Sequence, residues 1–432
     1  MNGVVLAGTR SSVGKTVATL VAIEALRAAG HDVQPAKAGP DFIDPSHHAA
    51  VADRPSRTLD LWLEGEDGLR RTYHRGEADV CVVEGVMGLY DGDASSTAMV
   101  AETLSLPVVL VVDAKAGMES VAATALGFET YAREIGRDVD VVGVIAQRAH
   151  GGRHERGIRE ALPDGLDYLG RIPPDDRLAI PDRHLGLHMG AEASLPREAL
   201  ADAASHLDVD GLVAAASEPA PAPDVREQSE TETTVAVARD AAFAFVYPAT
   251  AEYLRERGTV ETFSPVAGDP LPDADAIYLP GGYPELHADA LADSESLAAV
   301  TEAAAGGAPV LAECGGLMAL AESLTTTDGA THEMAGVLPA DVEMCDRYQA
   351  LDHVTLAATG HAPGLEVGQR FRGHEFHYSR ATVGRDARFA FDVVRGEGVD
   401  SERDGLVEYA TVGTYAHRHP ESGAFERLVD PA

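Results

Sequence analysis

Short runs of valine, leucine and isoleucine alternate with helical patterns through the first half of the chain. Four of these runs are typical of buried strands: Val4–Ala7, Val80–Val83, Val108–Val112 and Val141–Ile145. Between the first two, residues 16–29 form a helical pattern with Leu20, Ile23 and Leu26 on one face, and Gly30 ends it. This alternation predicts an α/β fold with a parallel sheet.

A second series of apolar runs begins near Thr234 and predicts a second α/β unit. Its expected strands are Val235–Ala238, Phe243–Val246, Val260–Phe263, Ala276–Leu279 and Pro309–Ala312. Between the two series, residues 217–233 read SEPAPAPDVREQSETET, which is the composition of an extended, solvated linker. The sequence therefore predicts two domains, residues 1–216 and 234–432, joined by a linker over residues 217–233.

Charge and cysteine content limit the kinds of binding partner and the cellular compartment that we expect for this chain. The 432 residues carry 70 Asp and Glu against 34 Lys and Arg, a formal charge of −36, which repels nucleic acid and anionic lipid surfaces. No apolar run approaches the length that spans a bilayer, and no leader pattern opens the chain. Three cysteines cannot form a disulfide framework for two domains. We expect a cytoplasmic protein without nucleic-acid or membrane partners.

A glycine-rich loop follows the first predicted strand and opens the first predicted helix. It runs from Gly8 to Thr16 with the sequence GTRSSVGKT, in which five residues separate the glycines where the strict P-loop has four. That variant loop resembles the one in dethiobiotin synthetase-like ATPases. The alternative, a Gly/Ser turn with an incidental lysine, fits less well because the motif lies between a strand and a helix. The predicted ATP-binding residues are Gly8, Thr9, Ser12, Gly14, Lys15 and Thr16.

Two further segments carry carboxylates at positions that suit phosphoryl transfer. Asp41 and Asp44 lie in a Gly/Pro-punctuated loop, and Glu84 ends a buried strand. Carboxyl ends of parallel strands are where open α/β sheets bind ligands, and carboxylate oxygens suit Mg²⁺ beside nucleotide phosphates. We therefore expect Mg²⁺ at Thr16, Asp41 and Glu84. Asp41 and Asp44 can equally be turn residues, whereas Glu84 at the end of so apolar a strand needs a cation or hydrogen bonds.

A second candidate site surrounds Cys314, which follows a predicted strand and precedes two glycines and a helical stretch. A nucleophile at such a turn is expected to be exposed, and the following helix N-terminus is expected to lower the pKa of its thiol. An isolated cysteine is more often a small buried hydrophobe, so the accompanying motifs decide.

Two of these motifs complete the expected glutaminase. Leu279–Pro284 offers backbone N–H groups for an oxyanion hole, with Gly282 and Gly315 as donors, and His417 is the expected base. The chain order resembles class I glutamine amidotransferase domains. The elbow has Ala312 where those domains carry glycine, and His419 stands where a carboxylate usually orients the base. An alternative register uses His419 as the base, with Glu421 as its acid.

Other histidines have spacings that zinc sites sometimes use. They are His47 with His48, His184 with His188, and His374 with His377. Because neither cysteine ligands nor a His-Glu-x-x-His pattern accompanies them, we interpret them as structural.

Taken together, the motifs resemble the cobyrinate a,c-diamide synthase family of corrinoid biosynthesis. The resemblance runs from about Val4 to His417, the linker apart, and it rests on six segments: residues 39–45, 84–92, 183–187, 279–285, 312–316 and 373–379.

This resemblance implies a two-domain, glutamine-hydrolysing ligase. Its expected substrates are small molecules: ATP, L-glutamine and a corrinoid polycarboxylate whose a and c acetates it amidates through acyl phosphates. In this family's terms Cys314 is the nucleophile and His417 its base, while Asp41, Asp44 and Glu84 serve metal binding and carboxylate activation. A homodimer is compatible with the resemblance.

Two alternatives remain open at this point. One is amidation of a related tetrapyrrole, hydrogenobyrinate or nickel-sirohydrochlorin, and the other is a P-loop switch ATPase with an inactive C-terminal domain. A polycarboxylate substrate also needs local positive charge on so acidic a protein. Arg10, Lys37, Arg54 and Arg57 are the expected source, because they are predicted to lie in loops near the ATP site.

Overall fold

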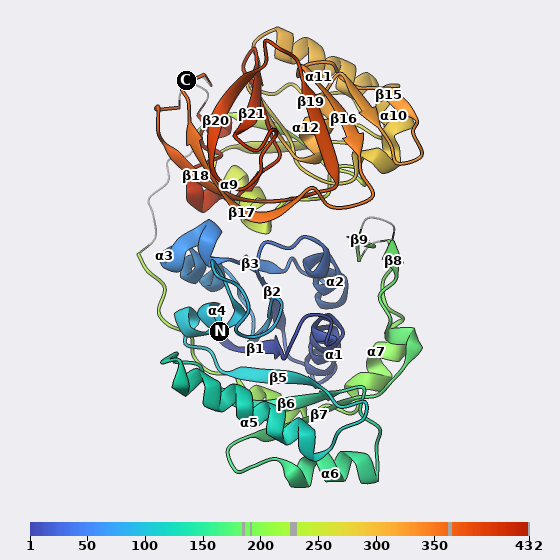
Figure 1. Ribbon diagram of the computed structural model, residues 1–432, viewed down its shortest axis with the longest axis vertical. Coiled ribbons are helices and arrows are strands. Elements are labelled where there is room, and N and C mark those ends of the chain that lie inside the picture. The colour runs from blue at the N-terminus through green and yellow to red at the C-terminus, as the bar shows by residue number, and fades with distance from the viewer. Residues whose placement is uncertain (184–185, 191, 225–230, 362–364, 431–432) are drawn as a thin grey trace. The chain divides into compact units, whose positions relative to one another are not determined.

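The chain folds into two compact units in the computed structural model, Met1–Val225 and Arg226–Ala432 (Figure 1). The structure describes residues 1–183, 186–190, 192–224, 231–361 and 365–430. No helix in these ranges is both long enough and apolar enough to cross a membrane.

Within the described part of the first unit, seven strands form a parallel sheet in the order β3-β2-β4-β1-β5-β6-β7. The strands are β1 (Asn2–Gly8), β2 (Val33–Ala38), β3 (Arg57–Leu59), β4 (Val80–Glu84), β5 (Val108–Asp113), β6 (Val141–Gln147) and β7 (Asp167–Ile172). The helices are α1 (Lys15–Ala28), α2 (Ile43–Ala52), α3 (Leu61–His74), α4 (Thr97–Leu104), α5 (Glu119–Glu134), α6 (Arg153–Ala161), α7 (Arg197–Ala204) and α8 (Val209–Ala215). Shorter elements are η1 (Asp176–Leu178), β8 (Asp182–Arg183) and β9 (Gly186–Leu187).

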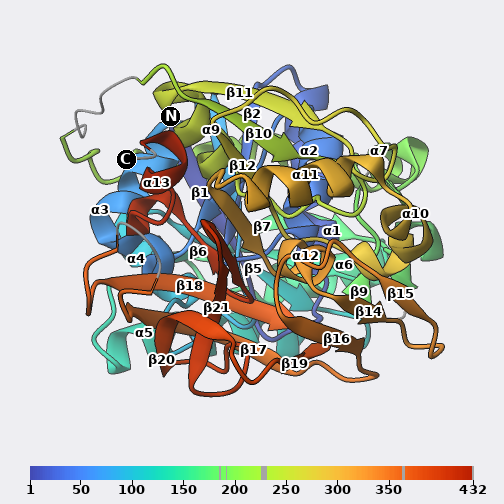
Figure 2. The same cartoon turned by 90° about the horizontal axis from the view of Figure 1, so that it is seen from above.

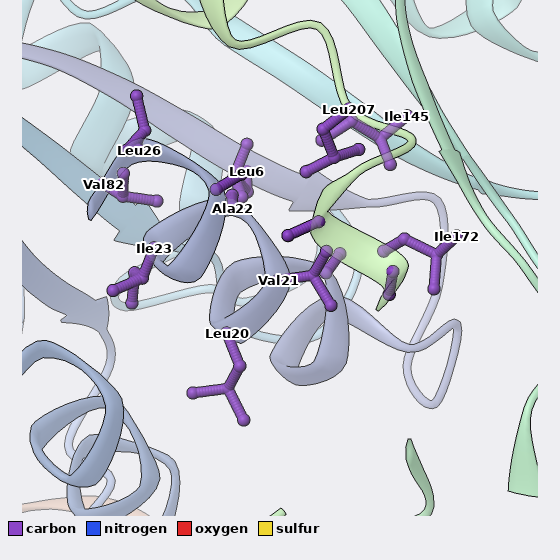
Figure 3. Close-up of a cluster of buried hydrophobic side chains, with 14 of the residues drawn as sticks. Leu6, Leu20, Val21, Ala22, Ile23, Leu26, Val82, Ile145, Ile172 and Leu207 are labelled. Carbon is purple, nitrogen blue, oxygen red and sulfur yellow. The ribbon is translucent and has the colours of Figure 1, made fainter. Parts of the chain in front are cut away.

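The sheet is buried on both faces, which explains why its strands are apolar at successive positions. On β1, Val4 and Leu6 belong to the core under α1, whereas Val5 and Ala7 belong to the core on the other face. Figure 3 shows the first of these cores, in which side chains of α1 such as Ile23 meet residues of the strands.

Within the described part of the second unit, ten strands form a mixed sheet in the order β11-β10-β12-β13-β22-β21-β20-β17-β18-β23. The strands are β10 (Thr234–Ala238), β11 (Thr259–Phe263), β12 (Ala276–Leu279), β13 (Val310–Glu313), β17 (Ala350–Ala358), β18 (Arg370–His377), β20 (Arg388–Arg395), β21 (Arg403–Glu408), β22 (Thr411–Thr414) and β23 (His417–Arg418). The first five in this spatial order run parallel and the rest antiparallel.

A smaller sheet and several short helices complete this unit, and Figure 2 gives a second view of them. The sheet contains β14 (Ser323–Thr325), β15 (Thr331–Glu333), β16 (Ala340–Met344) and β19 (Ser379–Val383). The helices are α9 (Pro248–Arg257), α10 (Ala288–Ala292), α11 (Glu295–Ala305), α12 (Gly315–Leu320), α13 (Glu426–Val429), η2 (Pro284–His287) and η3 (Pro420–Ser422).

The strand predicted over Phe243–Val246 is wrong. The carboxylate of Asp240 accepts the N–H groups of Ala242 and Phe243 at 2.9 and 3.2 Å, which turns the chain instead of extending it. Only an isolated bridge between Phe245 and Gly281 remains, and Pro248 then opens α9.

The first residues of the predicted linker are less solvated than expected. Ser217 exchanges both backbone hydrogen bonds with Gly3, at 2.8 and 3.1 Å, and the Ala220 N–H donates to the Leu104 carbonyl at 2.7 Å. The start of this segment therefore packs on the first unit. Residues 225–230 lie outside the described ranges.

The core under α1 gives a test of the fold. We expect Ile23→Ala to lower the free energy of unfolding of the first unit by about 2–5 kcal/mol, because Ile23 is fully buried and the truncation leaves a cavity. Urea unfolding measures this change. The partly exposed Glu24 on the same helix is the control, and Glu24→Ala should cost less than about 0.5 kcal/mol. Equal effects of the two variants would contradict the assigned helix face.

Candidate active sites

The glycine-rich loop joins β1 to α1 at the carboxyl edge of the parallel sheet. Ser12 and Gly14 have φ angles of 57° and 98°, so the loop doubles back before α1 begins. Lys15 is 7% exposed, and its Nζ donates to the Met87 carbonyl at 2.6 Å. Burial, together with the neighbouring Lys37, lowers the pKa of Lys15. Thr9 is half-buried and Ser12 exposed on the same loop. The loop and helix N-terminus form a geometry that suits a polyphosphate.

Thr16 brings two carboxylates together at this edge. Its Oγ1 lies 2.8 Å from Oε1 of Glu84 and 3.2 Å from Oδ1 of Asp44. Glu84 ends β4, and Asp44 lies in the first turn of α2. Three oxygens from three elements thus converge, and such oxygens are the ligands that Mg²⁺ takes beside nucleotide phosphates.

Asp41, which was expected to bind the metal, makes different contacts. Its Oδ1 accepts the N–H of Ile43 at 2.8 Å, and its Oδ2 lies 3.9 Å from Nζ of Lys37. Burial, and then the charge of Asp44, raises the pKa of Asp41 to about 7. It is therefore Asp44 whose carboxylate joins Thr16 and Glu84. In the described residues no group of three or more His, Cys, Asp or Glu side chains is arranged to hold a metal by itself.

Lys37 lies at the centre of this cluster, and its β2 strand was missed in the sequence. Its Nζ donates to Asp44 at 2.6 Å and to Glu84 at 2.9 Å, and β2 pairs with β4 so that Lys37 lies opposite Glu84. Burial alone would lower the pKa of Lys37, but the carboxylates hold it above its usual range. Burial alone would raise the pKa of Asp44, and Lys37 holds it below its usual range.

Two of the arginines expected in loops near the ATP site are placed differently. Arg54 pairs with Asp32 at 2.8 Å and donates to the Glu77 carbonyl, and Asp32 immediately precedes β2. Arg57 begins β3 and donates to the Arg75 carbonyl at 3.2 Å. Arg54 therefore lies toward the amino end of β2, and the prediction for it is wrong. Arg57 lies in a strand and not in a loop, and it pairs with Ala36 beside Lys37. Lys37 is not in a loop either, but it does reach the cluster.

In the second unit, Cys314 follows β13 and precedes α12 in a strained backbone conformation. Its φ is 48°, an uncommon value for a residue with a side chain. Its N–H donates to the Thr414 carbonyl at 2.7 Å. The expected strand, turn and helix are therefore present around the cysteine.

The expected exposure and low pKa of Cys314 are wrong. The residue is only 4% exposed, and burial, with the carboxylate of Glu285 next, raises the pKa of its thiol to about 12. The Gly315 N–H hydrogen-bonds the sulfur and opposes this shift, but does not overcome it. The thiol is therefore neutral in this structure.

Glycines allow the predicted oxyanion loop and His417 to approach the turn at Cys314 closely. A Cβ on Gly315 would lie 2.9 Å from N of Gly282, and one on Gly316 would lie 2.1 Å from the Leu279 carbonyl oxygen. A Cβ on Gly281 would lie 2.2 Å from Cε1 of His417. The two predicted oxyanion donors are thus adjacent, and the His417 ring packs on the same loop.

His417 is 2% exposed, and burial, followed by the neighbouring His377, lowers its pKa to about 3. It is therefore a neutral imidazole with an acceptor nitrogen. The alternative base, His419, contacts the Tyr247 ring at 5.7 Å and accepts the Glu421 N–H at Nδ1. This geometry favours His417 as the base, since its ring lies against Gly281 of the predicted oxyanion loop.

Two buried carboxylates bind the residues on either side of His417. Neither was predicted from the sequence as a site residue. Glu313 accepts N and Nε of Arg418, each at 3.2 Å, and the hydroxyl of Tyr278 at 2.8 Å. Asp404 accepts the N–H groups of Tyr415 and Ala416 at 3.0 and 3.3 Å. The signal for Glu313 was a carboxylate in an apolar strand, whereas no motif marks Asp404.

Two of the remaining histidines make contacts typical of structural residues. His47 contacts the His188 carbonyl at 2.8 Å, and His377 contacts the Ser379 carbonyl at 2.8 Å and stacks on Tyr415. His184 and Leu185, part of one resemblance segment, lie outside the described residues.

Two family models match this chain, one in each half. Residues 4–187 match the family model of a CobQ/CobB/MinD/ParA nucleotide binding domain, and residues 234–425 match that of a CobB/CobQ-like glutamine amidotransferase domain. A cobyrinate a,c-diamide synthase of Halobacterium salinarum is 66% identical over 432 residues, covering 100% of this chain and 98% of the relative. One of Haloarcula marismortui is 65% identical, covering 99% and 98%. A hydrogenobyrinate a,c-diamide synthase of Brucella abortus is 38% identical, covering 96% and 98%.

The raised pKa of Cys314 gives a chemical test. With a pKa of about 12, only about one thiol in ten thousand is ionised at pH 8, so we expect slow alkylation by iodoacetamide. The rate should rise about tenfold per pH unit between pH 7 and 10 without levelling off. Peptide mass spectrometry follows the reaction, with the half-buried Cys345 as the internal comparison. A plateau below pH 9 at Cys314 would contradict the neutral thiol.

Proposed function

This chain belongs to the cobyrinate a,c-diamide synthase family, and from that premise we propose that it amidates the a and c acetates of cobyrinate with ATP and glutamine. It is a carbon–nitrogen ligase with glutamine as the nitrogen donor. The observation that supports the proposal most is that one chain holds both a cysteine elbow and a P-loop with a carboxylate cluster. Small molecules are then its partners, and we propose that it works in the cytoplasm.

Glutamine hydrolysis is assigned to the second unit. The sulfur of Cys314 attacks the side-chain amide carbon, and the neutral imidazole of His417 takes the thiol proton and passes it to the leaving nitrogen. The N–H groups of Gly282 and Gly315 receive the developing oxyanion. Ammonia leaves, and water then hydrolyses the thioester to glutamate. Glu313 and Asp404 keep the His417 segment in place through the hydrogen bonds to Arg418, Tyr415 and Ala416.

Carboxylate activation is assigned to the first unit. A substrate carboxylate attacks the γ-phosphorus of ATP to give an acyl phosphate and ADP, and ammonia then displaces phosphate to form the amide. Lys15, the α1 N-terminus and the loop residues from Gly8 to Gly14 hold the phosphates. Thr16, Asp44 and Glu84 would hold Mg²⁺, which neutralises phosphate charge when bound.

Asp41 has a separate role in this proposal. Its pKa of about 7 suits a group that accepts a proton from the attacking nitrogen near neutral pH. Lys37 holds the pKa of the buried Asp44 below its usual range, which suits a metal ligand, and it also donates to Glu84. The activation chemistry thus uses charged groups, unlike the neutral cysteine and histidine of the second unit.

Cys314→Ser tests the division of labour. We expect this variant to lose glutamine-dependent amidation by at least about a thousandfold while ammonia-dependent amidation stays within about twofold of wild type, since the oxygen nucleophile is far weaker but the ATP site is untouched. Initial rates with glutamine or ammonium chloride, read by mass spectrometry of the corrinoid, give both values. Loss of both activities in a folded variant would contradict separate sites.

The macrocycle itself is a second test, because relatives with 36–66% identity carry cobyrinate names and others at 38% carry hydrogenobyrinate names. We expect two amidations of cobyrinate, with a higher kcat/KM than for hydrogenobyrinate or nickel-sirohydrochlorin. Turnover of each with ATP and glutamine, followed by mass spectrometry, ranks them. If hydrogenobyrinate ranks first, the assigned substrate is wrong while the reaction class stands. A switch ATPase would release no glutamate and amidate none of them.

A further inference from the structure

His48 lies behind the carboxylate cluster of the first unit. Its Nε2 is 2.6 Å from Oε2 of Glu84, and its Nδ1 is 3.0 Å from Oγ of Ser56. His48 and Glu84 are completely buried and Ser56 is 1% exposed. The sequence did not predict this chain of three side chains, since His48 was expected to be a structural histidine.

The contact with Glu84 fixes the proton on one ring nitrogen of His48. A carboxylate only accepts hydrogen bonds, so the Nε2–H of His48 donates to Glu84. The other ring nitrogen pairs with the Ser56 hydroxyl, which can donate or accept. The oxygen Oε1 of Glu84 is already used by Thr16 at 2.8 Å and Lys37 at 2.9 Å. His48 therefore holds the one carboxylate oxygen that faces away from the proposed phosphate and metal site.

The helix α2 places this contact. Asp44 and His48 are four residues apart on α2 and so lie on the same face, one turn from each other. Asp44 reaches Thr16 and Lys37 from the first turn, and His48 reaches Glu84 from the second. One helix therefore positions one carboxylate directly and orients the other through an imidazole.

We propose that His48 is a positioning residue for the ATP site: through Nε2 it fixes the rotation of the Glu84 carboxylate so that Oε1 faces Thr16 and Lys37. Partners of metal-binding carboxylates set the orientation of their ligands in this way. Without His48, Oε2 is a buried oxygen that can be satisfied only if the carboxylate rotates or water enters. The inference rests on the proposed function, because it assigns Glu84 to the ATP and Mg²⁺ site.

The order Ser56, His48, Glu84 resembles a hydrolytic triad, but the burial excludes that role. A nucleophilic serine must reach a substrate carbonyl, whereas Ser56 is 1% exposed. Ser56 is therefore a support for the ring. We expect its removal to have a smaller effect than removal of the Glu84 contact.

Two amide substitutions separate the two ring nitrogens of His48. In His48→Gln the side-chain nitrogen takes the place of Nε2 and can still donate to Glu84, whereas in His48→Asn it takes the place of Nδ1 and reaches only Ser56. We expect His48→Asn to lower kcat for ammonia-dependent amidation and the affinity for Mg·ADP by about 10–100-fold, and His48→Gln to stay within about fivefold of wild type. Isothermal titration with ADP, with and without Mg²⁺, measures the affinity independently of turnover.

His47→Leu is the matched control. It removes a buried imidazole from the same helix, but one that contacts the His188 carbonyl and not Glu84. We expect it to leave Mg·ADP binding within about twofold of wild type, and all variants to keep wild-type glutaminase activity. For Ser56→Ala we expect Mg·ADP affinity to fall by about two- to fivefold, because Ser56 contacts the ring of His48 and not Glu84 itself.

Each outcome decides the proposal. Equal losses in His48→Asn and His48→Gln, or equal losses in His48→Asn and His47→Leu, would show that only packing matters and would overturn it. Wild-type Mg·ADP affinity in His48→Asn would also overturn it. If His48→Asn does not fold, a Mg²⁺-dependent loss in Ser56→Ala supports it and an unchanged affinity overturns it. Failure of the wild type to amidate corrinoids would refute the proposed function alone, since the Mg·ADP titrations would still rank the variants.

Discussion

A carboxylate that water cannot reach must be neutralised by partners within hydrogen-bond distance, and both units are organised around one that ends a central parallel strand. Glu84 ends β4 and is held by Thr16, Lys37 and His48. Glu313 ends β13 and is held by Arg418 and Tyr278. In each case the partners come from segments far away in the sequence. The hydrogen bonds to one buried carboxylate therefore bring the residues of the site together.

The sequence was most informative where a residue's role depends on its own strand or turn. Apolar runs predicted β1, β4, β5 and β6, because strands buried on both faces carry hydrophobic residues at successive positions. The same rule missed β2, whose sequence VQPAKA contains a glutamine, a proline and the buried Lys37. The lysine is tolerated only because Asp44 and Glu84 lie beside it, and that arrangement is a property of the assembled sheet.

Errors at the cysteine elbow have the same origin. The order strand, cysteine, glycine, helix correctly predicted the turn, since turn chemistry is local. Exposure and charge depend on everything packed around the thiol. Here Glu285 lies near enough to oppose ionisation, and burial removes the solvent that would stabilise a thiolate. Likewise Asp404 was invisible as a site residue, because it is linked to Tyr415 and Ala416 only through backbone hydrogen bonds made after folding.

The burial of Cys314 has a consequence for the lifetime of the enzyme. Peroxide attacks thiolates and barely reacts with neutral thiols, so a cysteine that stays protonated at rest is protected from sulfenic and sulfinic acid formation. Cys81 on β4 is buried with a pKa raised to about 12 as well, and shares that resistance. Among the three cysteines, oxidation should therefore begin at Cys345, the least buried.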